Sequence, residues 1–354
     1  MEFRILDENF IDVDVVDVFS SFIWTDRYSA FGDFDMATAP SPHNLASLKP
    51  DRYIWSLESD RLMIIEDIRI TTDIESENQL IITGRSLESI LERRIIWVQT
   101  QLSGNFQNGI KKLLDDAIIN PTDPTRRIDN FIFQPSTDPA ITSLTISVQF
   151  TGTNLYEAIK GLCDDRNIGF KITLSSDNEF VFSLYAGVDR SYAQFTNPYV
   201  IFSPEFDNLL NSNYFYSKAN LKTVTLSAGE GEGLERRTVE VAIESGAESG
   251  LSRREMYTDA RDISSNNGEI LDQDYEDQLA QRGRNYLAEN VIIKAFEGNV
   301  DTSNMYIFGK DFFMGDIIQI VNEFGIESTS RITEIVRSQN EEGIQVFPTF
   351  VTIE

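Results

Sequence analysis

The chain has 354 residues, of which 41% are hydrophobic and 11% aromatic, so it can build folded cores and is not a disordered acidic tail. Its 57 acidic and 30 basic residues give a net charge of −27, which disfavours wrapping nucleic acid because phosphate contacts need clustered lysine and arginine. The single cysteine, Cys163, excludes an intramolecular disulfide framework, and no segment resembles an export signal or a membrane span.

Residues 1–95 have the sequence pattern of a first β-barrel-like domain. The segment Ile11–Val15 alternates apolar and acidic residues, which places its three apolar side chains on one face of a strand. The adjacent valines Val15 and Val16 break this alternation and predict a β-bulge. Further strands are expected over residues 22–25, 33–36, 53–57, 62–72 and 79–83.

Two local features of this first domain carry further predictions. Three prolines near the only histidine, His43, predict a surface loop over residues 40–50. Ser86 stands where its hydroxyl can cap a short helix over residues 87–94. The apolar residues of that helix share one face, so we expect it to pack over the mouth of a small sheet or barrel.

Residues 96–205 predict a smaller α+β domain. Asn154, followed by Glu157, resembles a helix-capping arrangement, and the helix after it has an apolar face that includes Cys163. The other expected elements are a helix over residues 110–118, a loop with short strands over 121–143, and a hairpin from 168–174 and 179–185.

Residues 206–354 predict a second β-barrel-like domain with a polar and helical insertion at about residues 229–290. The glycine run Gly229–Gly233 predicts a flexible hairpin tip, and the polar residues 244–267 predict an exposed or flexible loop. A helix follows, and the residues expected on its inner face are Tyr275, Leu279, Tyr286 and Leu287.

The closing segment Tyr306–Thr352 has an apparent counterpart near the start of the chain. Its middle hairpin matches residues 62–70 and 80–83, which flank a polar turn. The predicted fold class is therefore mainly β with α+β, in which two similar β-barrel-like domains flank a smaller α+β domain. A chain with two copies of one unit can assemble as a trimer and still present a ring of six.

The sequence contains no recognisable catalytic, cofactor-binding or metal-binding constellation. His43 lies among prolines, where a surface turn residue is more typical than a catalytic base, and Cys163 falls on an apolar helix face typical of core packing. Asp272-Gln273-Asp274 matches a calcium loop only in part. The run Gly229–Gly233 lacks the lysine of a phosphate-binding loop, and its two glutamates would repel phosphate.

Two other functions remain open on the residues alone. A hydrolase of host cell-wall polymers could use paired carboxylates, because acidic residues are abundant. An acidic decoy that mimics DNA is the other, although the many apolar strand patterns argue against it. The aromatic-rich segments 22–24 and 312–314 could anchor a partner, but packing inside the barrels is the simpler interpretation.

Three segments together resemble the siphovirus Gp37-like tail proteins, the baseplate or tail-tip hub proteins of long-tailed bacteriophages. They cover the start, the first helix and the end of the chain in the order of that family, whereas residues 95–220 match loosely. The segments are 22–28 with 32–34, then 82–94, and finally 313–318 with 331–335 and 346–350.

This resemblance implies a non-enzymatic structural protein of the virion, placed at the tail tip or baseplate and assembled in the host cytoplasm. It implies a homotrimer that forms a pseudo-sixfold ring on a hexameric distal tail protein. The trimer would close the end of the tail tube, contact the tape-measure protein and let DNA pass on infection without binding it specifically. Fibre or receptor-binding proteins are further partners that it implies, and wall hydrolysis would come from other proteins.

Overall fold

The computed structural model describes residues 2–72, 78–243, 249–297, 305–340 and 343–353. The N-terminal part consists of antiparallel strands and one short helix, which are β1 (Phe3–Leu6), β2 (Asp12–Val16), β3 (Ser21–Arg27), β4 (Asp33–Thr38), α1 (Pro42–Ser47), β5 (Tyr53–Ser56), β6 (Leu62–Thr71) and β7 (Gln79–Ser86).

The middle of the chain mixes helices with two small sheets. Its elements are η1 (Leu87–Arg93), β8 (Thr100–Asn105), α2 (Phe106–Leu114), η2 (Asp115–Ile119), η3 (Pro124–Arg126), β9 (Phe131–Gln134), α3 (Pro139–Thr142), β10 (Thr145–Phe150), α4 (Leu155–Asp165), β11 (Gly169–Leu174) and β12 (Phe180–Tyr185). The predicted hairpin is confirmed as β11–β12, and the predicted loop at 121–143 also holds the helices η3 and α3.

The C-terminal part returns to strands around one long helix. Its elements are β13 (Ile201–Phe202), η4 (Pro204–Phe206), β14 (Asn213–Ser217), β15 (Val224–Ala228), η5 (Gly233–Glu235), β16 (Thr238–Ala242), η6 (Gly250–Ser252), β17 (Glu255–Asp259), η7 (Asn266–Gly268), α5 (Asp272–Glu289), β18 (Ile293–Glu297), β19 (Ile317–Val321), β20 (Glu327–Asn340) and β21 (Gly343–Thr352). The fold is thus mainly β with some helices, as predicted.

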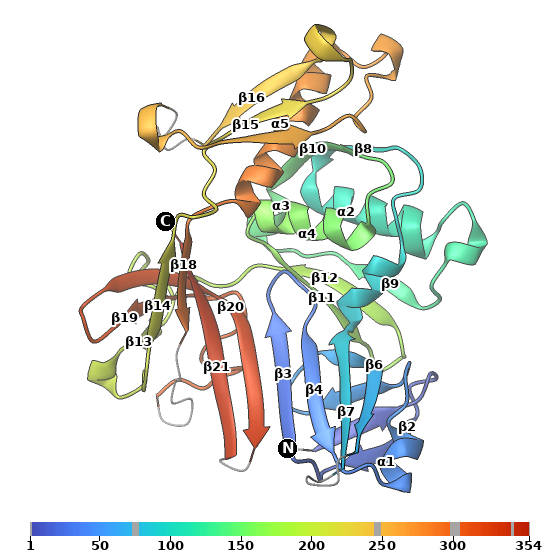
Figure 1. Ribbon diagram of the computed structural model, residues 1–354, viewed down its shortest axis with the longest axis vertical. Coiled ribbons are helices and arrows are strands. Elements are labelled where there is room, and N and C mark those ends of the chain that lie inside the picture. Colours follow the sequence, from blue (N-terminus) through green and yellow to red (C-terminus); the bar gives the residue numbers. More distant parts are fainter. Residues whose placement is uncertain (1, 73–77, 244–248, 298–304, 341–342, 354) are drawn as a thin grey trace.

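One 13-stranded sheet joins the N-terminal and C-terminal parts (Figure 1). Its strand order is β14-β18-β21-β20-β3-β4-β7-β6-β5-β1-β2, with β19 beside β20 and β13 beside β19. The long strand β20 makes the junction: residues 327–331 pair with β19, and residues 334–339 pair with β3. The N-terminal and C-terminal parts therefore share one continuous hydrogen-bonded sheet.

This junction corrects the expectation of two closed barrels. Strand β3 is paired on one side with β4 and on the other with β20. No side of β3 is left to pair with β6, so the N-terminal strands cannot close on themselves through β3. Among the described strands, the pairings form one open sheet and no closed barrel. The domain limits 1–95, 96–205 and 206–354 stay predictions.

The two ends of the chain nevertheless repeat one strand set in the same register. In each set, five residues from five strands face one another in a row across the sheet. The first row is Thr25, Asp33, Arg85, Ile64 and Tyr53, on β3, β4, β7, β6 and β5. The second row is Phe215, Ala295, Val351, Arg331 and Ile317, on β14, β18, β21, β20 and β19.

A bulge at the same step strengthens this correspondence. In β6 the pairing with β7 passes over Glu66, two residues after Ile64. In β20 the pairing with β21 passes over Thr333, two residues after Arg331. A bulge inserts one unpaired residue and bends its strand, so the two long strands carry the same local distortion at the same place.

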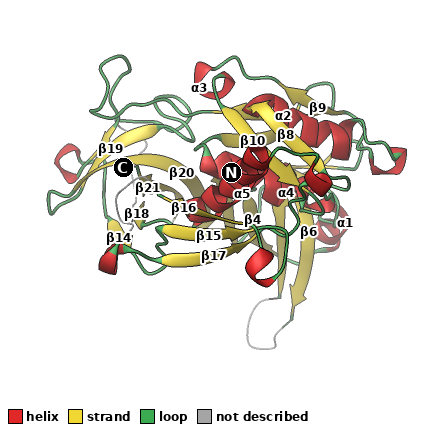
Figure 2. Ribbon diagram, turned by 90° about the horizontal axis from the view of Figure 1, so that it is seen from above, coloured by secondary structure: helices red, strands yellow, loops and turns green. Residues whose placement is uncertain are grey.

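The second strand set contains a long insertion. Strands β3 and β4 are joined by a short turn, whereas residues 218–292 separate β14 from β18. These residues form the sheet β16-β15-β17 with α5 packed across it, and α5 also contacts α4 and β10. The long insertion is therefore docked on the middle of the chain (Figure 2).

Each part of the fold has its own apolar core. Trp24 is among the largest buried side chains of the N-terminal core, Phe170 lies in the core of the middle, and Phe202 lies in that of the C-terminal part. A small fourth core forms in the insertion around Tyr275 and Leu279. Tyr275, Leu279 and Leu287 are buried as predicted, but Tyr286, in the last turn of α5, is 39% exposed.

Several local predictions of the N-terminal part are wrong. The bulge lies at Val13, which the pairing with β1 passes over, and not at Val15 and Val16. His43 lies in helix α1 and not in a loop, because Ser41 accepts a hydrogen bond from Asn44 N and caps the helix. Ser86 precedes η1 but does not cap it.

The hydroxyl of Ser86 has other partners, since it accepts from Gly32 N and donates to the buried Glu88. The helix that follows, η1, packs against β6, β7, β11 and α4, so it joins the strands to the middle of the chain.

Two capping and loop predictions had opposite outcomes. Asn154 caps α4 as predicted, because its side-chain oxygen accepts hydrogen bonds from the backbone of Tyr156 and Glu157. The polar stretch 244–267 is not only a loop, since its residues 255–259 form β17, which pairs in parallel with β15. Residues 244–248 of that prediction lie outside the described residues. β17 forms because it pairs with β15, a strand distant in sequence, and its local polar composition does not indicate a strand.

Candidate functional site

The junction between β3 and β20 is held by ion pairs as well as by backbone pairing. Arg337 Nη1 lies 2.6 Å from Asp26 Oδ2, and both side chains are buried. Asp26 also accepts hydrogen bonds from Trp24 Nε1 at 2.9 Å and from the Ser59 hydroxyl. A buried carboxylate needs such partners, because removing a charge from water is costly. This pair joins residues at the two ends of the chain.

A second ion pair at the junction is less buried. Arg27 Nε lies 2.6 Å from Glu334 Oε2, and Arg27 Nη1 lies 2.7 Å from Asp33 Oδ2. Burial alone would lower the pKa of Arg27, but the two carboxylates raise it above its usual value. Arg27 therefore stays charged and bridges β4 to β20.

The first open edge of the sheet is the second half of β6. On the side where β5 lies, strand pairing stops at Ile64 and hydrogen bonding at Ile65, so among the described strands residues 67–71 pair with β7 alone. Asp67, Arg69 and Thr71 are exposed, and Ile70 is 51% exposed. Exposed strand edges present unpaired N–H and C=O groups that readily accept another strand.

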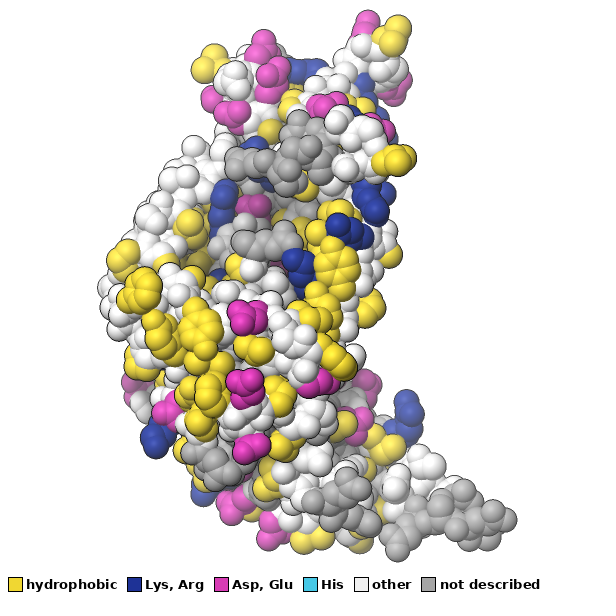
Figure 3. Space-filling view, turned by 90° about the vertical axis from the view of Figure 1, so that its left-hand side faces the viewer, with side chains coloured by type: hydrophobic (Ala, Val, Ile, Leu, Met, Phe, Trp, Pro, Cys, Tyr) yellow, Lys and Arg dark blue, Asp and Glu magenta, His cyan; other side chains and the backbone are white. Residues whose placement is uncertain are grey.

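The second open edge is β14, which has β18 as its single neighbour in the described strand order. Two of its aromatic side chains are exposed, Phe215 at 52% and Tyr216 at 45%, whereas Tyr214 packs against the C-terminal core. The ammonium groups of Lys218 and Lys294 lie 5.7 and 5.9 Å from the centre of the Tyr216 ring. Figure 3 looks onto the side of the molecule that carries β14 and shows hydrophobic side chains gathered across this face.

These two edges lie at opposite sides of the molecule. β14 is at the left and β6 at the right in both views of the fold (Figures 1 and 2). A molecule with two different open sheet edges on opposite sides can assemble head to tail, with one edge of each copy against the other edge of the next. The end strand β2 presents a third edge, and Ile11, Val13 and Val15 in and beside it are exposed.

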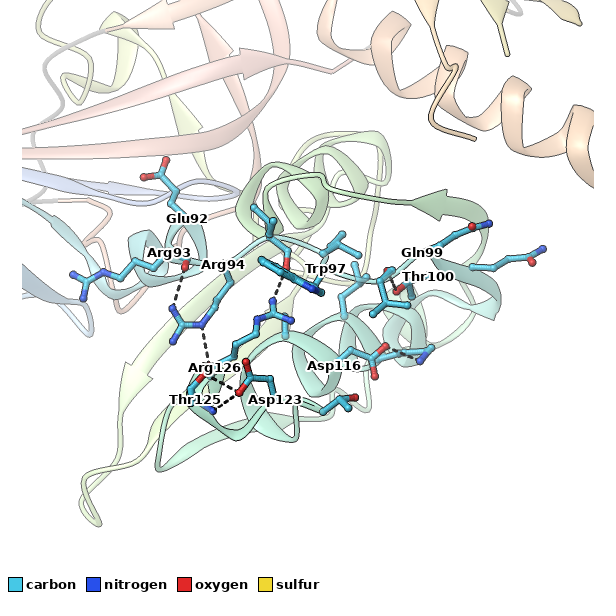
Figure 4. A pocket seen from close by; sticks show the side chains of 18 residues that line it. Glu92, Arg93, Arg94, Trp97, Gln99, Thr100, Asp116, Asp123, Thr125 and Arg126 are labelled. Atoms are coloured by element: carbon cyan, nitrogen blue, oxygen red, sulfur yellow. Dashed lines mark hydrogen bonds and ion pairs between the residues drawn. The ribbon is translucent and has the colours of Figure 1, made fainter. Parts of the chain in front are cut away.

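A separate pocket lies in the middle of the chain, between η1, α2 and η3, with a cavity volume of about 830 Å³ (Figure 4). Arg94 Nε donates to the backbone oxygen of Arg126 at 2.9 Å, and Arg126 Nη2 donates to the oxygen of Ile95 at 2.7 Å. The guanidinium of Arg126 also lies 5.4 Å from the centre of the Trp97 ring, which is 69% exposed.

The pocket has a local excess of positive charge in an otherwise acidic protein. Burial lowers the pKa of Arg94 below its usual value, and so do the neighbouring cations Arg126 and Arg93. Three carboxylates also line the pocket: Glu92 is bound to Arg85 outside the lining, Asp116 pairs with Lys112, and Asp123 accepts a hydrogen bond from Thr125 N. The lining therefore has four cations and three carboxylates, an excess of one positive charge.

The residues considered for catalysis have structural partners. His43 Nε2 lies 3.0 Å from Asp14 Oδ2 on the surface of the N-terminal part. Cys163 is buried on α4, which confirms the prediction that it packs in a core. Asp272-Gln273-Asp274 forms the first turn of α5, and Arg237 pairs with Asp272. Among the described residues, no group of acidic, histidine and cysteine side chains is arranged to hold a metal ion.

The glycine run predicted as a hairpin tip does connect two strands, β15 and β16. It is held in place, however, because Glu230 accepts hydrogen bonds from Ser265 and its backbone N–H donates to the Tyr275 hydroxyl. Within the described part of the chain, no helix combines the length and the apolar character that a membrane crossing requires.

The aromatic segments divide between core and surface. Phe22 and Trp24 are buried and Ile23 is exposed, whereas Phe312 is buried and Phe313 is 45% exposed. The buried ion pairs Asp26–Arg337 and Arg61–Glu88 were not indicated by the sequence. Asp26 and Arg337 lie on β3 and β20, and Arg61 and Glu88 lie outside the strands, so no local pattern pairs these residues.

Two comparisons with known proteins find similar proteins, and a third finds none. The profile described as "Siphovirus ReqiPepy6 Gp37-like protein" matches residues 2–350. A search of curated proteins finds no match. Three solved structures have a similar fold: the 43 kDa tail protein of prophage MuSo2 from Shewanella oneidensis, a tail protein from Neisseria meningitidis MC58, and the prophage tail protein gp18 from Listeria monocytogenes EGD-e.

The similarity to these structures extends over nearly complete chains. The Shewanella protein has a TM-score of 0.60 and 14% identity, and the match covers 99% of this chain and 98% of the other. The Neisseria protein has a TM-score of 0.57 and 12% identity, with 99% and 95% covered. The Listeria protein has a TM-score of 0.52 and 12% identity, with 99% and 94% covered. At such identities the likeness establishes a shared fold.

Replacing Arg337 with methionine tests the buried ion pair at the junction. The variant leaves the Asp26 carboxylate buried without its cation, so the free energy of unfolding should fall by about 3–5 kcal/mol in urea titrations. The control is Lys112→Met, which removes the exposed pair with Asp116 and should cost about 0.3–0.5 kcal/mol. Equal losses in the two variants would contradict a structural role for the junction pair.

The thiol of Cys163 should be unreactive in the folded protein. Burial raises its pKa well above the usual value of about 8.5, so at about pH 8 it stays protonated, and reagents reach it poorly. Titration with a chromogenic disulfide should find no reactive thiol per chain in the native protein and one after unfolding in guanidinium chloride. Rapid reaction of the native protein would show that α4 does not bury this side chain.

Proposed function

Because the chain belongs to the Siphovirus ReqiPepy6 Gp37-like family of phage tail proteins, we propose that it is the trimeric hub of the tail tip. In this proposal, three chains close the distal end of the tail tube and join it through a hexameric distal tail protein. The hub also contacts the tape-measure protein and opens to let DNA pass. The family and the similar structures support the coarser statement that the chain is a structural component of a phage tail.

The repeated strand set is the observation that carries the proposal. One chain contains two five-stranded sets with the same row of facing residues and the same bulge. Three chains arranged around an axis would therefore present six equivalent sets, which is the number needed to meet a six-part ring. Closed rotational symmetry is the usual arrangement of homo-oligomers.

The charge of the chain suits a conduit for DNA. With a net charge of −27, the protein repels phosphate groups that approach closely, over a range of about 8 Å at physiological salt. A wall of this kind lets DNA pass without holding it. General solubility explains an acidic surface equally well, so the charge supports the proposal only in combination with the strand repeat.

A hydrolase with paired carboxylates is the competing function. The pKa of Glu289 is raised above its usual value, chiefly by burial; Lys160 lowers it, and Asp164 and Glu157 raise it. A carboxyl group with a raised pKa is what a general acid requires. The fully buried acids Asp26, Glu88 and Asp316, in contrast, are each bound to an arginine.

The mass of the purified protein tests the hub proposal. Light scattering at micromolar concentration should give three times the chain mass, and the trimer should bind the hexameric distal tail protein of the same phage in a ratio of three to six. A protein that stays monomeric and does not respond to the distal tail protein would refute the hub.

A zymogram on host cell walls tests the competing function. The structural proposal expects no clearing by the wild-type protein and no difference between wild type and Glu289→Gln. A clear band that disappears in Glu289→Gln but persists in Glu269→Gln, an exposed carboxyl on another segment, would instead identify a hydrolase.

A further inference from the structure

We propose that neighbouring chains join by adding β14 of one chain to the open half of β6 of the next. The proposed register places Ser217 opposite Asp67, Tyr216 opposite Ile68, and Phe215 opposite Arg69. This inference rests on the proposed trimer and specifies the contact between its chains. The partner is a second copy of this chain, and the two strands pair in an antiparallel sheet.

The junction inside the chain is the template for this contact. The second half of β20 pairs with β3 beyond the point where β19 ends. In that pairing, Glu334 is opposite Arg27, Ile335 is opposite Asp26, and Val336 is opposite Thr25. The fold therefore already contains one joint between two copies of the strand set.

The first half of the register follows from the two long strands. β6 and β20 correspond residue by residue, because each has its bulge two residues after the shared row. Glu334, the first residue after the bulge of β20, therefore corresponds to Asp67, the first residue after the bulge of β6. On β20 this half is covered by β3, whereas on β6 the same half has no described strand beside it.

The other half of the register follows from β3 and β14. Thr25 faces Asp33 in the first row, and Phe215 faces Ala295 in the second, so Thr25 corresponds to Phe215. Asp26 then corresponds to Tyr216, and Arg27 to Ser217. β3 is covered by β20 on the outer side of its set, and β14 has no described strand on that side.

The side chains at the two open edges fit this joint. At the internal junction, Asp26 and Arg337 are diagonal neighbours on one face and form a buried ion pair. The corresponding residues at the open edges are Tyr216 and Ile70, which are 45% and 51% exposed in the single chain. An apolar pair thus replaces an ion pair at the same position, and cross-strand neighbours of this kind stabilise a sheet when covered.

The charged residues at these edges are also compatible with it. Asp67 would lie opposite Ser217, directly beside Lys218, in the place where Glu334 meets Arg27 inside the chain. Arg69 would lie opposite the exposed ring of Phe215, where a guanidinium is attracted to an aromatic face. Like charges do not face each other at any of the three positions.

The position of the edges on the molecule favours a ring over a pair. β14 and β6 lie at opposite sides of the fold in two perpendicular views (Figures 1 and 2). A contact between two different edges is head to tail, so it repeats until the rotation closes. Closure with three chains would bring six strand sets into one continuous sheet and leave neither of these edges open.

A pair of engineered cysteines tests the register directly. The double variant Arg69→Cys with Phe215→Cys places two thiols on directly opposed residues, whose separation in an antiparallel sheet suits a disulfide. Because Cys163 is buried, it does not compete. After mild oxidation, denaturing gels should show covalent dimers and trimers that disappear on reduction.

The matched control shifts one cysteine by a single residue. Ile70→Cys with Phe215→Cys puts the two side chains on opposite faces of the sheet, so it should give less than about a tenth of the cross-linked product. Light scattering of the reduced variants, run in parallel, reports the size. Trimers that cross-link equally in both variants or in neither would overturn the register but leave the hub intact. Reduced wild-type protein that is monomeric would overturn the hub and this contact together.

Discussion

The pairing of β3 with the second half of β20 is the contact on which the rest of this fold depends. It joins two strands that are far apart in sequence. The buried ion pair between Asp26 and Arg337, which lie 311 positions apart, stabilises it. Without it, the strands at the two ends of the chain would form separate sheets. With it, two copies of one strand set lie side by side in one sheet, and the β3–β20 pairing shows how two such sets can join.

The local elements of this fold were largely predictable from the sequence, and their connections were not. Alternation and turn residues indicated most N-terminal strands, and the Asn154 cap and the β11–β12 hairpin follow from short-range chemistry. β17 and the halves of β20 depend on partners far along the chain, which no local pattern specifies. The prediction of closed barrels was wrong for the same reason, because strand patterns do not reveal that β3 pairs with β4 on one side and with β20 on the other.

The candidate interface shows the same division. Exposure of Phe215, Tyr216 and Ile70 contradicts the simple expectation that apolar strand residues are buried, and their place at strand edges explains why. The apparent similarity between the chain's ends was visible in the sequence, but the shared row of facing residues appears only in the sheet register. The arginine-lined pocket lies apart from these edges and was not anticipated, because its cations come from η1 and η3, which are separate in sequence.

The account rests on the equivalence of the two strand sets within an assembled particle. Electron microscopy of the purified protein, viewed along the symmetry axis, tests this most directly. For a trimeric hub we expect a ring with threefold symmetry whose inner wall shows six similar densities around a central opening. A particle with twofold symmetry, or a threefold particle whose inner wall is built from only one of the two strand sets, would contradict it.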